Sequence, residues 1–124
     1  MQASPVIEVE RTMVLGKALQ RAAECLGLNG RTLARTVGFS EPTVSRILRG
    51  ERGIAPDSKE GQLSLMLIRV FRSLDALVGG DDAKRRAWMG SHNTALGGVP
   101  AALVVTPEGL ARLLAYLDGM RAPI

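Results

Sequence analysis

Basic and hydroxyl side chains gather between Gly30 and Gly50, in the stretch GRTLARTVGFSEPTVSRILRG. Such side chains bind phosphate oxygens, and an arginine can also donate two hydrogen bonds to the edge of a guanine base. Between Asn29 and Gly53, five arginines stand against two glutamates, a local surplus of three positive charges. This surplus could neutralise phosphates of a nucleic acid, but charge alone favours the alternative of a solvated arginine face.

The remaining residues of this stretch predict two short helices that meet at a sharp turn. Asn29 can cap the first helix, Gly38 gives the turn its backbone freedom, and Ser40 can cap the second helix. The small Ala34 lets the helices cross closely, and Pro42 falls in the first turn of the second helix. The apolar wedge between the two helices is expected to consist of Leu33, Val37, Phe39, Val44 and Ile47. This pattern is typical of a helix-turn-helix, with an ordinary helical hairpin as the alternative.

With the apolar side chains inside, polar residues remain on the surface that a helix-turn-helix presents to the major groove of DNA. The predicted DNA-binding residues are Arg31, Ser40, Glu41, Thr43, Ser45, Arg46 and Arg49. Arg46 or Arg49 can make a bidentate contact with guanine. Arg31, Thr43 and Ser45 are expected to hold phosphates and fix the register on the duplex.

The rest of the chain predicts further helices, so we expect an all-α fold. Apolar residues recur at spacings of three and four after Arg11, which predicts a helix that Gly27 can end. Residues 62–78 are apolar over more than one stripe, so this helix is expected to pack on two sides. It is either a central core helix or the shared core of a dimer.

Two more helices are expected towards the end of the chain. Asp81 or Asp82 can cap a helix that runs to Met89, and Thr106 can cap a final helix that Gly119 ends. The connector ERGIAPDSKEGQ has little to bury and divides the chain. We therefore predict a helix-turn-helix domain with an N-terminal arm at 1–58 and a second helical domain at 59–124.

Composition excludes several classes of protein. The 124 residues are 46% hydrophobic and carry a net charge of only +4, and the longest uncharged apolar run is too short and too rich in glycine to span a membrane. The chain start lacks the apolar centre of a secretory signal, and one cysteine cannot form an internal disulfide, so a cytoplasmic location is expected. Neither a catalytic constellation nor a metal-ligand cluster can be located, which argues against an enzyme and against a cofactor or metal.

The segment AWMGSHNTALGGVPAALVVTPEGL carries a family resemblance. Its order of aromatic, Asn, Gly pair, Pro and Thr-x-x-Gly is similar to that of the toxin-binding domain of Xre/MbcA/ParS antitoxins, in which an Xre-like helix-turn-helix comes first. The matching residues are Trp88, Asn93, Leu96, Gly97, Gly98, Pro100, Leu103, Thr106, Gly109 and Leu117. The chain departs from the family at Ala101 and Ala102, where an acidic residue is common, and at Val104 and Val105, where leucine is usual.

The resemblance implies a type II antitoxin that blocks a toxin encoded beside it and represses their shared promoter. The usual partner is a RES-domain toxin, a family known for consuming NAD+, so a cofactor would belong to the partner. We expect a homodimer within a larger complex, bound to double-stranded operator DNA. A stand-alone dimeric helix-turn-helix regulator, whose C-terminal domain dimerises or senses a ligand, is the alternative.

The end of the chain is the predicted toxin-binding segment. A short tail leaving a firm helix can enter a partner's cleft at modest entropic cost. The residues expected to do so are Gly119, Met120, Arg121, Ala122, Pro123 and Ile124. A merely disordered terminus is the alternative.

Overall fold

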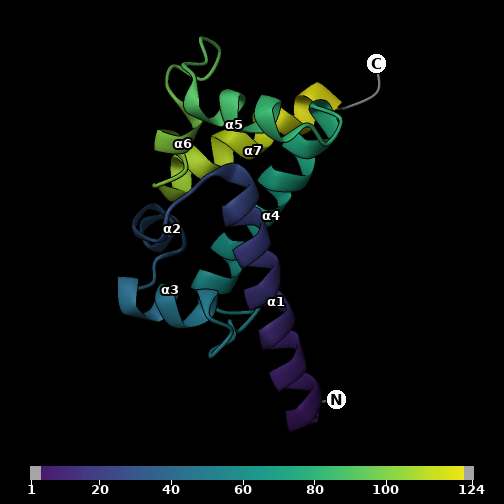
Figure 1. Ribbon diagram of the computed structural model, residues 1–124, viewed down its shortest axis with the longest axis vertical. Helices are drawn as coiled ribbons and strands as arrows, with labels where there is room; N and C mark the ends of the chain where they lie inside the picture. Colours follow the sequence, from purple (N-terminus) through teal and green to yellow (C-terminus); the bar gives the residue numbers. More distant parts are fainter. Residues whose placement is uncertain (1–3, 122–124) are drawn as a thin grey trace.

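The computed structural model describes residues 4–121, which form seven helices and no strand. In chain order the helices are α1 (Pro5–Leu26), α2 (Gly30–Val37), α3 (Glu41–Leu48), α4 (Lys59–Leu77), α5 (Asp82–Gly90), α6 (Pro100–Leu103) and α7 (Pro107–Arg121) (Figure 1). Within the described range, Asn93 and Gly98 form an isolated backbone bridge. The expected all-α fold is confirmed.

Helix α1 is longer than the sequence pattern predicted, because it begins at Pro5 and not after Arg11. The Ser4 side chain accepts a hydrogen bond from the backbone N–H of Ile7 (3.3 Å), and Pro5 takes the first helical position, where a missing N–H costs little. The predicted end is confirmed, since Gly27 adopts the left-handed conformation (φ 73°). The first turns of α1 project beyond the other helices (Figure 1).

Helices α2 and α3 form the predicted helix-turn-helix. The Asn29 side chain accepts from Thr32 N at 2.8 Å, and the Ser40 hydroxyl accepts from Thr43 N at 3.3 Å, so each helix has its expected cap. Gly38 turns the chain between them in the left-handed conformation (φ 82°). The wedge is buried at Leu33, Val37, Val44 and Ile47, while the Phe39 ring is half-buried. The packing of α1 on α3 completes this unit.

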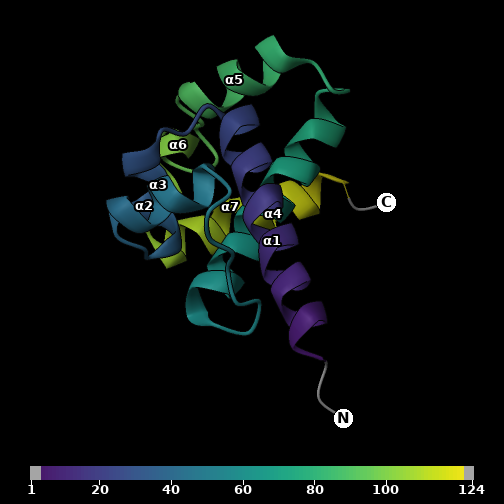
Figure 2. The ribbon, with the colours of Figure 1, turned by 60° about the horizontal axis from the view of Figure 1, so that its bottom comes forward.

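Helix α4 packs on two sides, as its broad apolar surface predicted. It packs against α1 and α2 on one side and against α7 on the other, and Figure 2 shows α1, α4 and α7 next to one another. The buried side chains of α4 include Leu67, Ile68, Val70 and Leu74. Because α4 contributes to the packing of both halves, the division of the chain after residue 58 stays a prediction.

After α4 the chain forms a C-terminal corner, residues 82–121, which consists of α5, the turn that follows it, α6 and α7. Asp81 caps α5, and the Asn93 side chain accepts a hydrogen bond from Leu96 N (3.1 Å) to close the turn that follows. Thr106 caps α7 by accepting from Gly109 N at 3.0 Å. A Cβ at Gly109 would collide with the carbonyl oxygen of Leu103, so glycine is what allows α6 and α7 to approach this closely.

The prediction that Gly119 ends the last helix is wrong, because α7 continues to Arg121. A glycine inside a helix costs only about 1 kcal/mol relative to alanine, which local contacts can offset. Here the Arg121 guanidinium donates a hydrogen bond to the Ser73 hydroxyl of α4 (3.0 Å) and ties down the last turn. Gly119, Met120 and Arg121 are therefore helical.

Candidate functional site

The polar face of α3 lies outside, as the sequence predicted. Glu41, Arg46 and Arg49 are exposed, whereas Thr43 and Ser45 are half-buried. Within residues 4–121 the Arg46 side chain takes part in no hydrogen bond or ion pair, so its guanidinium is directed to solvent without a competing partner there. Arg46 is thus the α3 arginine that needs the least rearrangement to contact DNA.

Ser40 and Thr43 form a small hydroxyl pair at the beginning of α3. The Ser40 hydroxyl donates to Thr43 Oγ1 (2.9 Å) and accepts from Thr43 N (3.3 Å). Because Thr43 Oγ1 acts as an acceptor in this pair, its own O–H proton remains available for a phosphate oxygen. Both residues lie where the helix N-terminus adds positive potential.

A shallow hollow brings the predicted residues of the two helices together. It is lined by Gly30, Arg31, Glu41, Pro42, Val44, Ser45, Leu48 and Arg49. Arg31 at the start of α2 thereby faces Ser45 and Arg49 on α3. The N-terminus of α2 opens into the same hollow, with nothing within 4 Å of the position where a Gly30 Cβ would stand. A helix N-terminus beside arginine and serine side chains suits a phosphate group.

The Arg49 side chain already has hydrogen-bond partners within its own chain. Its guanidinium makes two hydrogen bonds of 3.1 Å to the Glu51 carboxylate, and its Nη1 donates to the Ser45 hydroxyl at 2.7 Å. The hydrogen bonds with Glu51, followed by the charge of its carboxylate, raise the pKa of Arg49. The same hydrogen bonds, followed by the charge of Arg49, lower the pKa of Glu51. The charge of Arg46 also contributes to the lowered pKa of Glu51. In the sequence Glu51 is only an opposing charge, because residues two apart on a helix do not face each other and the contact forms only where the chain turns after α3.

The C-terminal end of α7 is a separate polar cluster. Asp118 accepts hydrogen bonds from Arg69 Nη2 (3.0 Å) and from the Ser73 hydroxyl (3.1 Å), both on α4, and Arg121 donates to the same Ser73 hydroxyl. Met120 is exposed. The predicted toxin-binding segment therefore starts on a helix fixed to α4, while its last residues, Ala122, Pro123 and Ile124, lie outside the described residues.

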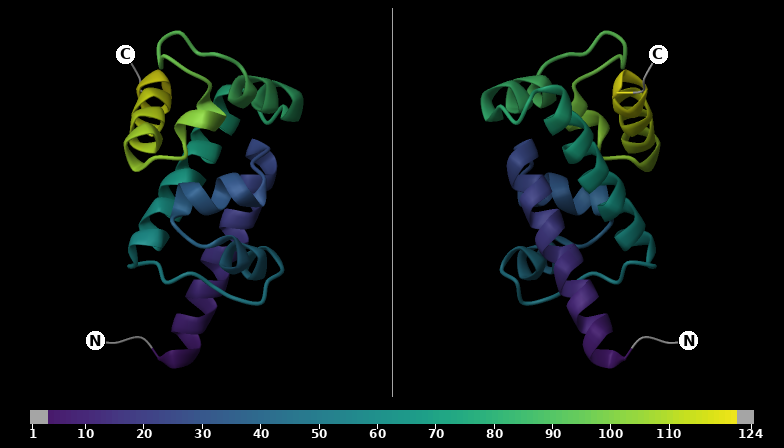
Figure 3. Two further views of the ribbon diagram at one scale, coloured as in Figure 1. Left: turned by 90° about the vertical axis from the view of Figure 1, so that its left-hand side faces the viewer. Right: turned by 90° about the vertical axis from the view of Figure 1, so that its right-hand side faces the viewer.

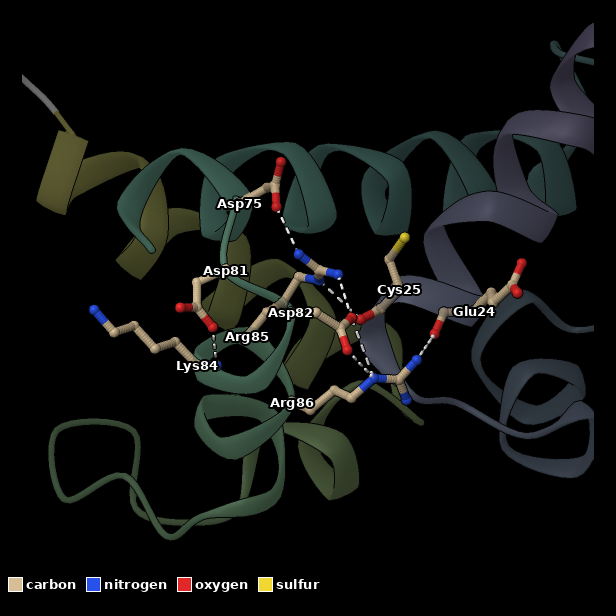
Figure 4. A network of polar contacts seen from close by, with 8 residues as sticks. All are labelled: Glu24, Cys25, Asp75, Asp81, Asp82, Lys84, Arg85 and Arg86. Atoms are coloured by element: carbon tan, nitrogen blue, oxygen red, sulfur yellow. Dashed lines mark hydrogen bonds and ion pairs between the residues drawn. The ribbon is translucent and has the colours of Figure 1, made fainter. Parts of the chain in front are cut away.

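A polar network holds the two halves of the chain together, and Figure 4 shows its residues. The buried Arg85 of α5 donates to the carboxylates of Asp75 (2.7 Å) and Asp82 (2.6 Å) and to the backbone carbonyl of Cys25 at the end of α1 (2.8 Å). Arg86 adds a hydrogen bond to the carbonyl of Glu24 (2.9 Å). Two arginines of α5 thus satisfy carbonyl groups at the negative end of the α1 dipole.

The two candidate surfaces lie far apart. Figure 1 and both views in Figure 3 place α3 and the C-terminal end of α7 on opposite sides of the molecule, with α4 between them. In the part of the chain that the structure describes, no helix has the length and apolar character needed to cross a bilayer. Residues 4–121 also contain no cluster of three His, Cys, Asp or Glu side chains suited to a metal ion.

A helix-turn-helix with an exposed arginine face is typical of DNA-binding proteins, and here it is joined through the shared helix α4 to a second helical module. Two family models match the chain. Residues 5–69 match the antitoxin Xre-like helix-turn-helix domain, and residues 73–122 match the antitoxin Xre/MbcA/ParS C-terminal toxin-binding domain. The chain belongs to the Xre/MbcA/ParS-type antitoxins, as the resemblance predicted. No curated protein matches it significantly.

Proposed function

We propose that this antitoxin neutralises a RES-domain toxin that degrades NAD+ and, as a cytoplasmic homodimer, represses the promoter that both genes share. The observation that carries the proposal is the pairing of an Xre-like helix-turn-helix with a toxin-binding domain in one chain. The wide separation of the α3 surface from the end of α7 supports simultaneous binding of DNA and toxin.

For the DNA-binding function, α3 enters the major groove and the hollow beside it receives a phosphate. Arg46 reads a base, and Arg31 and Ser45 hold the backbone. Arg49 contacts DNA after exchanging the Glu51 carboxylate for a base edge or a phosphate. The start of α3, with Ser40, Glu41 and Thr43, approaches the duplex first.

The DNA surface is tested by operator binding, measured by fluorescence anisotropy over a series of salt concentrations. Arg46→Ala is expected to weaken binding about 10- to 100-fold and to lower the salt slope by about one. Arg21→Ala removes the same charge from an exposed position of α1 and is the matched control. Equal effects of the two substitutions would show that only net charge matters and would contradict the proposed role of α3.

For the toxin-binding function, the end of α7 delivers Met120 to Ile124 into the active-site cleft of the toxin. The last buried residue of α7 is Leu117, so removing Met120 to Ile124 leaves the apolar core intact. The deletion is expected to abolish neutralisation while operator binding persists. The measurement is NAD+ consumption by the toxin encoded beside this gene, in the presence of each antitoxin variant.

A control variant replaces Met120 to Ile124 with glycine and serine and so keeps the chain length. It is expected to fail as an inhibitor, because the proposed cleft recognises side chains. Full neutralisation by the deletion variant, with unchanged complex affinity, would exclude the tail mechanism. Neutralisation of a neighbouring toxin that leaves NAD+ untouched would instead contradict only the RES assignment.

A further inference from the structure

Arg52, which follows α3, is an exposed arginine outside the set of DNA-binding residues named above. Its guanidinium carbon lies 5.3 Å from the centroid of the Phe39 ring, which is a cation–π contact. Within residues 4–121 the Arg52 side chain takes part in no hydrogen bond or ion pair, and the neighbouring Glu51 carboxylate is bound to Arg49. A ring, unlike a carboxylate, leaves the positive charge and the N–H donors of Arg52 available to a ligand.

The backbone next to Arg52 is fixed on α1. The Ile54 N–H donates to the carbonyl oxygen of Thr12 (3.0 Å), and the Ile54 side chain is buried. A Cβ at Gly53 would collide with Thr12, so glycine allows the chain to lie directly on the helix. Arg52 is therefore held by α1 at its backbone and by Phe39 at its guanidinium. A side chain that is already ordered loses less conformational entropy on binding.

Phe39 and Arg31 lie at opposite ends of α2. The helix has eight residues and is therefore about 12 Å long. The major groove of B-DNA is also about 12 Å wide, with a phosphate backbone at each edge. Neither Phe39 nor Arg52 lines the hollow that contains Arg31. The two arginines are thus separate cationic points, and their spacing suits phosphates on the two strands that border one groove.

We propose that Arg52 binds a phosphate of the operator, on the strand opposite the one that Arg31 holds, and that Phe39 is the residue that positions it. The inference rests on the DNA-binding function proposed above and adds a second backbone contact to it. An arginine with free donors and no acidic partner suits a phosphate group, and the surplus of positive charge between residues 29 and 53 favours a polyanion.

The first experiment is fluorescence anisotropy of the full chain over a series of salt concentrations, with its own promoter duplex and with a scrambled duplex of the same length. Arg52→Ala is expected to weaken binding to both duplexes about tenfold and to lower the salt slope by about one, because a phosphate contact carries no sequence information. Arg21→Ala, at an exposed position of α1, is the matched control and is expected to change both affinities less than about twofold.

A double-mutant cycle tests the positioning role of Phe39. Phe39→Leu keeps an apolar side chain in the wedge but removes the ring, and is expected to weaken promoter binding about two- to fivefold without changing the salt slope. In an Arg52→Ala background the same substitution is expected to have no effect on binding. Circular dichroism checks that each variant keeps its helix content. An equal loss in both backgrounds would show that Phe39 acts through the fold, and would overturn its positioning role.

Neutral methylphosphonates, placed one at a time along each strand of the promoter duplex, locate the two phosphates. A substitution that weakens binding of the wild type but not of Arg52→Ala marks the phosphate of Arg52, and Arg31→Ala marks the other phosphate in the same way. Within one half-site the two phosphates are expected on opposite strands. Two phosphates on the same strand would overturn the proposed arrangement.

Failure of this inference differs from failure of the proposed DNA surface. If Arg46→Ala has its expected effect and Arg52→Ala behaves like Arg21→Ala, the second backbone contact is overturned and the α3 surface stands. If Arg52→Ala weakens binding to the promoter duplex alone, Arg52 contacts a base, and the phosphate assignment is overturned. A wild-type chain that binds neither duplex overturns both the inference and the proposed DNA-binding function.

Discussion

The helix-turn-helix and the C-terminal corner differ in how their sequence relates to their binding surfaces. On α3, core residues and exposed residues alternate within two turns, so identifying Val44 and Ile47 as buried also identifies Arg46 and Arg49 as exposed. In the corner, the residues that identify the family are mostly those that make the fold. The sequence pattern of the helix-turn-helix therefore indicates which residues are exposed to a ligand. The sequence pattern of the C-terminal corner mainly indicates its fold.

The family residues of the corner have structural tasks that can be named. Asn93 closes a turn through its side chain and pairs its backbone with Gly98 (2.8 Å). Thr106 caps α7, and Gly109 makes room for the Leu103 carbonyl. Trp88 is half-buried against the core. These contacts explain why the motif has its spacing.

The largest expected effect tests the structural role of Gly109 in the corner. The test replaces glycine with alanine at two positions of α7. Gly109→Ala places a Cβ against the Leu103 carbonyl, and is expected to destabilise the protein by on the order of 3 kcal/mol. Gly119→Ala has open space and a helical backbone, and is expected to stabilise it by up to about 1 kcal/mol. Urea unfolding followed by circular dichroism measures both. Effects of the same sign would contradict the structural role given to Gly109.

A second prediction concerns the contact between the two regions. Arg85→Met removes three hydrogen bonds of a buried guanidinium, and is expected to cost about 2 kcal/mol, because Asp75 and Asp82 keep access to water. Arg86→Met, at the exposed neighbour, is expected to cost less than about 1 kcal/mol. Thermal unfolding by calorimetry is the measurement. Two separate transitions in the wild type would show that the regions unfold independently and that Arg85 does not join them.

Most of the fold could be predicted because its signals are local. The caps at Asn29, Ser40, Asp81 and Thr106 each act on an N–H three residues ahead, so the sequence contains both partners. Two errors lie at chain ends, and the short helix α6 (Pro100–Leu103) was not predicted either. The start of α1 was missed because residues 5–10 present no stripe that their own chain buries, and the end of α7 was missed because its anchor, Ser73, stands 48 residues from Arg121.

For the candidate site, the exposed residues could be predicted from the sequence, but the contacts between them could not. Burial of the wedge predicts which side of α3 is exposed, and the structure has that arrangement. The hollow that brings Arg31 to Ser45 depends on the crossing of α2 and α3, which no local pattern specifies. The engagement of Arg49 was also missed, since a carboxylate two residues away counts as a charge in the sequence but becomes a hydrogen-bond partner only once the chain turns after α3.

The smallest expected effect concerns the pair of Arg49 and Glu51. Glu51→Gln removes one negative charge near the DNA surface and releases the Arg49 guanidinium, so operator affinity is expected to rise about two- to fivefold at low salt. In an Arg49→Ala background the same substitution is expected to have less effect, since no guanidinium is left to release. Fluorescence anisotropy on the four variants gives the coupling between the two residues. An equal rise in operator affinity in both backgrounds would show that Glu51 acts only through its negative charge and not through its contact with Arg49.

The pH dependence gives the same pair an independent check. Hydrogen bonds from Arg49 lower the pKa of Glu51, so the carboxylate stays charged until the pH falls below the ordinary glutamate range. The contribution of the pair to folding is thus present above the ordinary glutamate pKa and is lost as the pH falls through the lowered value. Operator affinity should therefore show no titration of Glu51 between neutral pH and mild acidification, and Glu51→Gln should keep its advantage throughout that range. An advantage that vanishes on mild acidification would indicate that Glu51 titrates in its ordinary range and that the Arg49 contact is not formed in solution.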